Sequence, residues 1–355
     1  MIQGKDDALE DGVYFALPFD EYLGLPRLSA SGIKSIGVHP LEFWARSWLN
    51  PNREPEEESE FQELGTAYHK RVIEGRAAFD SAYTARLEPE EYPDALRTMD
   101  DIRAACRERS VKPLTGRKDE LVERLLAADP AVQVWDELVR DHAGEHPGKV
   151  LLSGRAINTI EIRARMIEAH PGLSKAFTGG LPEVTVLWTE EVEVDPGKFV
   201  DVPMKARLDY LKARAVVDLK TFSNPLGKQI DRAIVGEIAA RRYFIQAAGY
   251  LDAGNRAAAF IKQGQVHDAP RDPDAAKRIV QADRTFLFVF QATGPAPIAK
   301  GVTMPRMILD GGAVAWRDGI YQYAQNIHLY GTDPWVGAEP IRDLDSTEFP
   351  AWTME

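Results

Sequence analysis

Three charged side chains between residues 205 and 221 have the types and spacing of a metal-dependent active site. Asp218 and Lys220 flank Leu219, and Asp209 precedes them in the same segment. Burying two carboxylates and an ammonium on an otherwise apolar sheet is costly unless a ligand compensates them. A divalent metal such as Mg²⁺ takes hard oxygen ligands, and a nearby lysine can orient or help to activate water. The alternative is a solvated strand face with a salt bridge, because an Asp-x-Lys triplet alone is a weak pattern.

The elements that would position these side chains are two strands joined by a tight turn at residues 212–214. Their apolar positions are Ala206, Leu208, Tyr210, Val216, Val217 and Leu219. Residues two apart on a strand point to the same face, so Asp218 and Lys220 share one. A hairpin can bring Asp209 onto that face as well.

A helix predicted from Phe61 to Ile73 carries a further candidate ligand. Gly65 and His69 are four residues apart and therefore lie on one helix face. Glycine inside a helix costs up to about 1 kcal/mol, and close packing against another backbone is one explanation for Gly65. His69 can reach a metal site from beside the sheet, in which case its protonation predicts loss of activity below about pH 6.5. The alternative is a half-buried histidine with an ordinary hydrogen bond.

Composition bounds the class of protein. The chain has 355 residues, 44% of them hydrophobic and 28% charged, as expected of a soluble globular protein with one large domain or two smaller ones. The only cysteine, Cys106, excludes an internal disulfide and fits a reducing cytoplasm. We recognise no zinc-type Cys/His cluster, no signal peptide at the start and no apolar run long enough to span a membrane. The net charge of -12 argues against a protein that coats nucleic acid, but it does not exclude a nuclease.

Periodicity predicts further elements after the first helices. They are a short helix over Leu173–Phe177, strands over Glu183–Val194, Lys198–Leu211, Ala257–Gln263 and Thr285–Gln291, and helices over Ile234–Ala253 and Gly312–Tyr330. The helix that begins at Ile234 carries Gln246 and Tyr250 on one face. Glu183 begins the first long strand.

The segment from residue 96 to 128 forms a separate unit of two amphipathic helices. Its second helix begins in Gly116-Arg-Lys-Asp, so Arg117 and Lys118 lie at a helix N-terminus. Backbone N–H groups at such an end also favour the binding of a phosphate. The layout resembles a SAP motif, a small helix-extended-helix module known for binding DNA. The alternative is a solvated helical hairpin that pads the fold, because acidic residues dilute the basic charge.

Taken in order, the motifs resemble the PD-(D/E)xK nuclease superfamily and its RecB-like group, most closely the RecE-type exonucleases (exonuclease VIII) of phages and prophages. The segments that carry the resemblance are Leu28–Lys34, Glu63–His69, Pro182–Trp188, Lys205–Asp209, Asp218–Lys220 and Gln246–Tyr250. Leu208 stands where the name of the family has proline. The resemblance implies a restriction-endonuclease-like α/β fold, with a central mixed sheet flanked by helices.

The resemblance also implies a role for each site residue. Asp209, Asp218, His69 and the carbonyl of Leu219 would bind the metal, Mg²⁺ with Mn²⁺ as a possible substitute. Lys220 would position the attacking water and steady the phosphate charge. Glu183 would bind a second metal or support the first, or else be an ordinary charge at a strand start. Gln246 and Tyr250 would contact the DNA backbone or support Lys220, or else only pack the helix.

We therefore divide the chain into residues 1–95 (N-terminal helical part of a nuclease domain), 96–128 (SAP-like insert), 129–335 (nuclease core) and 336–355 (tail). The expected function is Mg²⁺-dependent exonuclease digestion of double-stranded DNA ends from 5′ to 3′, with a single-strand annealing protein as partner and a homo-oligomeric ring as a possible assembly. The alternatives are a structure-specific or single-strand nuclease of the same fold, and a DNA-end binding module without activity.

Overall fold

The structure of the protein is a computed structural model that describes residues 9–54, 60–279, 284–337, 341–343 and 345–348. Of Glu60, Phe61 and Ser346 it describes only the backbone. The expectations for the start of the chain, and for most of the tail after residue 336, fall outside the described residues. No helix in the described part is both long and apolar enough to cross a membrane.

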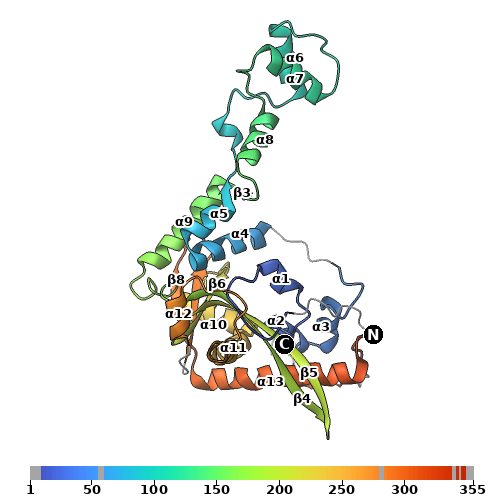
Figure 1. Ribbon diagram of the computed structural model, residues 1–355, viewed down its shortest axis with the longest axis vertical. Coiled ribbons are helices and arrows are strands. Elements are labelled where there is room, and N and C mark those ends of the chain that lie inside the picture. The colour runs from blue at the N-terminus through green and yellow to red at the C-terminus, as the bar shows by residue number, and fades with distance from the viewer. Residues whose placement is uncertain (1–8, 55–59, 280–283, 338–340, 344, 349–355) are drawn as a thin grey trace.

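A six-stranded mixed sheet forms the centre of the body (Figure 1). Its spatial order is β1 (Gly12–Tyr14), β4 (Leu181–Asp195), β5 (Lys198–Leu211), β6 (Ala215–Phe222), β7 (Thr285–Ala292) and β8 (Ala299–Val302). Neighbouring strands run antiparallel except β6 and β7, which are parallel. The predicted hairpin is present, because the Lys212 N–H donates to the Ala215 carbonyl and closes the turn between β5 and β6.

Helices cover both faces of the sheet, which confirms the predicted α/β fold class. Val216 on one face packs in a core with α2 (Ala30–Ile36), α11 (Tyr243–Gln263) and α13 (Arg306–Tyr330). Val217, its neighbour in β6, points the other way and packs with α4 (Glu60–His69) and α9 (Gly154–Ala169). This alternation follows from the period of two in a strand, and it leaves β6 apolar on both sides except at its charged residues.

The remaining elements are short. They are α1 (Phe19–Gly24), α3 (Pro40–Arg46), a π-helix η1 (Lys70–Glu74), α5 (Arg76–Ala82), β2 (Tyr83–Ala85), η2 (Pro89–Glu91), α6 (Met99–Glu108), α7 (Lys118–Ala128), α8 (Trp135–Glu145), β3 (Val150–Leu152), α10 (Ile230–Ala240), α12 (Pro273–Arg278) and η3 (Ser346–Glu348). Ser29 caps α2, since its hydroxyl accepts from the Gly32 N–H.

Residues between β2 and β3 project from the body as an arm, with α6 and α7 at its far end and α8 nearer the body (Figure 1). β2 and β3 pair in parallel at its base. The two helices expected in the 96–128 insert are α6 and α7, and they share a small core in which Ile102, Leu121 and Leu125 are fully buried. The arm is longer than that insert, because η2 and α8 belong to it too.

Three predicted elements were wrong. The helix expected from Ile234 to Ala253 is two helices, α10 and α11, separated where Arg242 takes a left-handed conformation with φ of 50°. The strand expected from Ala257 to Gln263 is the end of α11, since a short apolar run does not distinguish a strand from a buried helix. Residues 173–177 form turns instead of a helix.

Candidate active site

The candidate site lies where β5 and β6 separate. Their described pairing is limited to Tyr210 with Val217 and Leu211 with Val216. Beyond these two pairs, the side chain of Asp209 takes the place of a backbone carbonyl. Its Oδ2 accepts a hydrogen bond from the Leu219 N–H at 2.8 Å. The N–H and C=O of a strand residue point to the same side, so the Leu219 carbonyl also faces this gap. Both ligands predicted from this part of the hairpin therefore face one opening.

Asp218 and Lys220 project from the same face of β6, as their spacing predicted. The Lys220 ammonium lies 2.6 Å from Asp218 Oδ2, and Gln246 on α11 donates to Oδ1 at 3.0 Å. Asp218 is completely buried. The Lys220 ammonium compensates the charge on Oδ2, but no described residue donates a well-aligned hydrogen bond to that oxygen. A buried carboxylate oxygen in this state is available to a further cation.

The charges of the cluster do not balance. Burial raises the pKa of Asp218 to about 6, against the opposing effect of Lys220. Burial also raises the pKa of Asp209 to about 6, and the negative charge of Glu183 adds to this effect. Burial alone would lower the pKa of Lys220, but Asp218 and Asp209 together hold it above its ordinary value. Two carboxylates thus share one ammonium, and further positive charge at this point would stabilise them.

His69 lies at the end of α4 and faces the same gap. Its Nδ1 is 3.9 Å from Asp209 Oδ2, and a third of its side chain is exposed. Burial and the charge of Lys220 lower its pKa, which keeps the imidazole neutral and able to bind a metal. Gly65 does not pack closely against another element, since a Cβ there would meet no atom within 4 Å. The expected reason for that glycine was therefore wrong.

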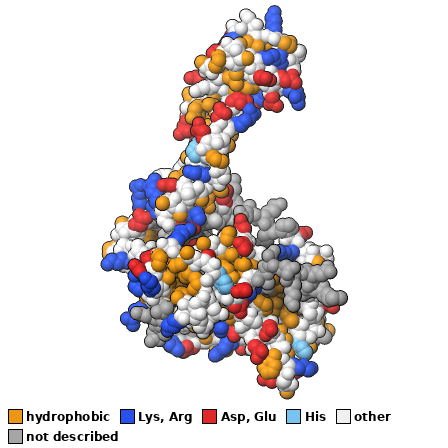
Figure 2. All heavy atoms as spheres, in the orientation of Figure 1, with side chains coloured by type: hydrophobic (Ala, Val, Ile, Leu, Met, Phe, Trp, Pro, Cys, Tyr) orange, Lys and Arg blue, Asp and Glu red, His pale blue; other side chains and the backbone are white. Residues whose placement is uncertain are grey.

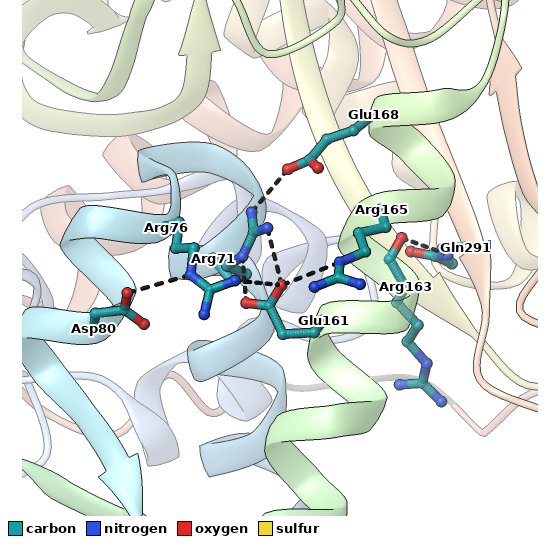
Figure 3. A network of polar contacts seen from close by, with 8 residues as sticks. All are labelled: Arg71, Arg76, Asp80, Glu161, Arg163, Arg165, Glu168 and Gln291. Carbon is teal, nitrogen blue, oxygen red and sulfur yellow. Dashed lines mark hydrogen bonds and ion pairs between the residues drawn. The ribbon is translucent and has the colours of Figure 1, made fainter.

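A buried polar network fixes the helix that presents His69 (Figure 3). Arg71 in η1 donates to Glu161 of α9 at 2.7 Å and to Glu168 of α9 at 2.9 Å. On the other side of His69, Tyr68 is buried and donates its hydroxyl to Gln291 of β7. Because both neighbours are anchored, the ring of His69 is held at the edge of the gap. A π-helical turn such as η1 frequently occurs at functional sites.

Glu183 lies beside the cluster in an unusual backbone conformation. It falls between the pairs Pro182–Tyr210 and Val184–Leu208, opposite Asp209, and its φ is 54°. Its carboxylate accepts from the Arg207 guanidinium at 2.5 Å. A non-glycine residue with positive φ often marks a site where strain serves function. Arg207 compensates the charge of Glu183, as Lys220 does for Asp218.

Helix α11 supplies the residues behind the cluster. Gln246 donates to Asp218, so it supports a carboxylate that neighbours Lys220. Tyr250 lies within the field of the cluster, because burial raises its pKa and the charges of Asp218, Asp209 and Glu183 raise it further. The side chain of Gln246 is buried, so it does not reach a surface where DNA could contact it.

Sequence reasoning missed two residues of the site, Lys34 and Tyr243. The ammonium groups of Lys34 and Lys220 each lie 5.4 Å from the centre of the Tyr243 ring. Burial and repulsion by Lys220 lower the pKa of Lys34 to about 8. Lys34 is the last residue of Leu28–Lys34, one of the segments that carry the family resemblance. Its place in that motif could have predicted its place at the site. No pattern in the sequence pointed to Tyr243, because the break between α10 and α11 was not predicted.

The structure does not bring Arg117 and Lys118 to this site. They lie at the start of α7, at the far end of the arm (Figure 1). Arg117 contacts Glu120 at 3.2 Å, and Lys118 contacts Asp136 at 2.6 Å. Acidic and basic side chains are mixed over the visible face of the arm (Figure 2). Both predicted phosphate contacts therefore already have acidic partners.

The donor types at the gap suit a divalent metal, although His69, Asp209 and Asp218 do not bring one ligand atom each within 4.8 Å of one another. They combine two carboxylates, a neutral imidazole and a carbonyl that faces the same opening, and hard cations such as Mg²⁺ and Mn²⁺ prefer oxygen donors. The fit rests on the buried Asp218 Oδ2, which has no hydrogen-bond partner among the described residues. A cation would satisfy this oxygen and balance the excess negative charge.

Comparison with known proteins gives a limited result. No protein-family model matches the sequence, and no curated protein matches it. Among solved structures, the chain is similar to a crystal structure from Eubacterium rectale described as a "putative exonuclease", with 12% sequence identity and a TM-score of 0.44. The alignment covers 87% of this chain and 88% of that one.

Proposed function

We propose that this chain is a metal-dependent deoxyribonuclease with a restriction-endonuclease-like core. The observation that carries the proposal is the grouping of Asp209, Asp218 and Lys220 at the separated strands, where two carboxylates with raised pKa values share one ammonium. The two carboxylates share the Lys220 ammonium, so their desolvation is only partly compensated. A site that awaits a cation explains this state.

In this proposal Asp209 and Asp218 hold a divalent metal, with His69 and the Leu219 carbonyl as further donors. The bound metal supplies Lewis-acid stabilisation of phosphate charge and a more acidic water. Lys220 orients the attacking water and donates to the phosphate oxygen that gains charge. Gln246 fixes the rotamer of Asp218, and Glu183 with Arg207 sets the field around Asp209.

The finer proposal concerns the substrate. We propose double-stranded DNA ends, 5′-to-3′ digestion, a single-strand annealing protein as partner and a ring-shaped homo-oligomer as the assembly. The support is the ordered set of sequence motifs, of which Asp209, Asp218-x-Lys220 and His69 come together at one opening. A structure-specific or single-strand nuclease uses the same cluster and is the second candidate. A DNA-end binding module has no need of the complete cluster.

Digestion of labelled DNA tests the proposal. Linear duplex labelled at the 5′ or 3′ end, and the same duplex as a closed circle, are incubated with Mg²⁺ or with chelator. We expect early release of the 5′ label, a persistent 3′ label, an intact circle and no reaction with chelator.

Each other outcome selects a different account. Cleavage of single strands or branches, with intact duplex ends, supports the second candidate. Binding to ends without cleavage in either Mg²⁺ or Mn²⁺ supports the binding module. Cleavage that continues in chelator contradicts the metal-dependent proposal altogether.

A further inference from the structure

A group of side chains that could hold a metal ion lies at the end of α8, in the arm and away from the sheet. His142, Glu145 and His146 stand at positions i, i+3 and i+4 of the chain, so they neighbour one another at the last turn of the helix. One ligand atom from each lies within 4.8 Å of the others. The two imidazole rings are 4.5 Å apart between centres.

Backbone carbonyls orient both imidazoles. Nε2 of His142 lies 2.7 Å from the carbonyl oxygen of Ala85 in β2, and Nδ1 of His146 lies 2.9 Å from the carbonyl oxygen of His142. A carbonyl only accepts, so each of these nitrogens carries the proton. The lone pair then falls on Nδ1 of His142 and Nε2 of His146. Metal-binding histidines show this arrangement, with one ring N–H donated to a carbonyl and the other nitrogen free for the metal.

The third side chain completes a mixed donor set. Glu145 is exposed and makes no ion pair with a described lysine or arginine. Two imidazoles and one carboxylate are the donors of a zinc site that keeps an open position. Mg²⁺ prefers oxygen ligands, so this group and the carboxylate site at the sheet differ in the metal they favour.

We propose that His142, Glu145 and His146 bind a transition-metal ion of the zinc class. The ion ties the end of α8 to β2 through the ring of His142 and its contact with Ala85. Since β2 pairs with β3 at the base of the arm, metal binding there stiffens the connection between arm and body. The H-x-x-E-H spacing of His142-Ala-Gly-Glu-His146 was the available sequence signal for this site, and it was missed.

Metal titration of the full, untagged chain tests this site. The background variant Asp218→Asn removes a carboxylate of the other site, and excess Mg²⁺ occupies what remains there. We expect one equivalent of Zn²⁺ to bind, and Co²⁺ to give the visible absorption of a four-coordinate site. The double variant His142→Ala with His146→Ala should lose this equivalent. The single variant Glu145→Gln should bind Zn²⁺ about tenfold or more weakly.

His170→Ala is the matched control, because His170 is also half-buried with one ring nitrogen on a backbone N–H. It should keep the bound Zn²⁺. Retention of one equivalent by the double variant would overturn the proposal, as would equal loss in His170→Ala. If circular dichroism shows that the double variant does not fold, Glu145→Gln decides, and unchanged Zn²⁺ affinity in that variant overturns the proposal.

Discussion

The gap between β5 and β6 and the far end of the arm hold their charges in opposite ways. At the gap, Asp218 is completely buried and one of its oxygens lacks a hydrogen-bond partner among the described residues. At the arm, Arg117 is 82% exposed and already paired with Glu120. Burial without full compensation is expensive, whereas exposed ion pairs contribute roughly 0–1 kcal/mol. The first state indicates a ligand, and the second is stable without one.

The two regions also have separate cores. Ile102, Leu121 and Leu125 pack within the arm, whereas Val216 and Leu219 each belong to a separate core of the body. Substitutions at the surface of the arm should therefore leave the gap undisturbed. This separation allows the contrast between the regions to be tested by changes in one region at a time.

The largest expected effect comes from Asp218→Asn. The change keeps the shape of the side chain but removes the buried charge that would hold the metal, so cleavage should fall about a thousandfold or more, equivalent to about 4 kcal/mol. DNA binding should persist in a filter or anisotropy assay. The matched control is Asp195→Asn, which removes a carboxylate paired with Lys198 near the turn between β4 and β5. Equal activity of the two variants would contradict the site.

Glu161→Ala should cause the largest loss of stability. It leaves the buried Arg71 with only the more exposed Glu168, and breaking a buried pair costs about 3–5 kcal/mol. Chemical denaturation measures the loss, and metal affinity should also weaken because Arg71 anchors the helix of His69. The matched control Glu168→Ala removes the other partner of Arg71, whose side chain is 58% exposed, and should cost about 1 kcal/mol or less. Similar losses would mean that burial does not distinguish the two contacts.

The pH dependence should follow the carboxylates. Asp209 and Asp218 have pKa values near 6 in the folded protein and ordinary values near 3.8 when unfolded. Between these values the folded state binds more protons, so the free energy of unfolding of the metal-free protein should fall as pH rises from about 4 to about 6. Metal must displace those protons, so stabilisation by Mg²⁺ should be greater at pH 7.5 than at pH 5.

His69 should oppose this trend, because its pKa is lowered in the folded protein and the unfolded chain takes up this proton first as pH falls below about 6.5. The lowered pKa also moves the expected loss of activity by protonation of His69 to a pH lower than about 6.5. Melting temperatures with and without Mg²⁺ at the two pH values measure the effect. Equal Mg²⁺ stabilisation at both would contradict the raised pKa values.

The smallest effect is expected at the arm. The double variant Arg117→Ala with Lys118→Ala removes two charges that already have acidic partners, so duplex affinity should change by less than about threefold at moderate salt. If these residues do contact phosphates, each lost contact would flatten the slope of log affinity against log salt by about one. Affinity across a salt series therefore decides whether the SAP-like resemblance extends to DNA binding.

Local patterns in the sequence predicted much of the site. The alternation around Asp209 and Asp218-x-Lys220 predicted the hairpin, and the structure places these residues and His69 around one opening. Such patterns have a period that a single strand or helix determines. The separation of β5 from β6 was not predictable, because it depends on pairing between distant segments.

Other features of the structure could not be predicted either, because they too depend on contacts between distant segments. The break at Arg242 has no proline or glycine to signal it, and it places Tyr243 beside Lys220. The pairing of β2 with β3 joins short segments separated by the whole arm, so the length of the arm was underestimated. The sequence also could not predict that Glu183 pairs with Arg207, because this contact joins residues of two different strands.

Binding of Mn²⁺ followed by electron paramagnetic resonance tests the central claim most directly, because it reports metal at the site without requiring DNA. The measurement uses the His142→Ala and His146→Ala background, which removes the arm histidines. The account predicts that Asp218→Asn weakens Mn²⁺ binding at least about tenfold, while Asp195→Asn leaves it unchanged. Mn²⁺ binding of equal strength in both variants would contradict the claim that the carboxylates between β5 and β6 hold a metal.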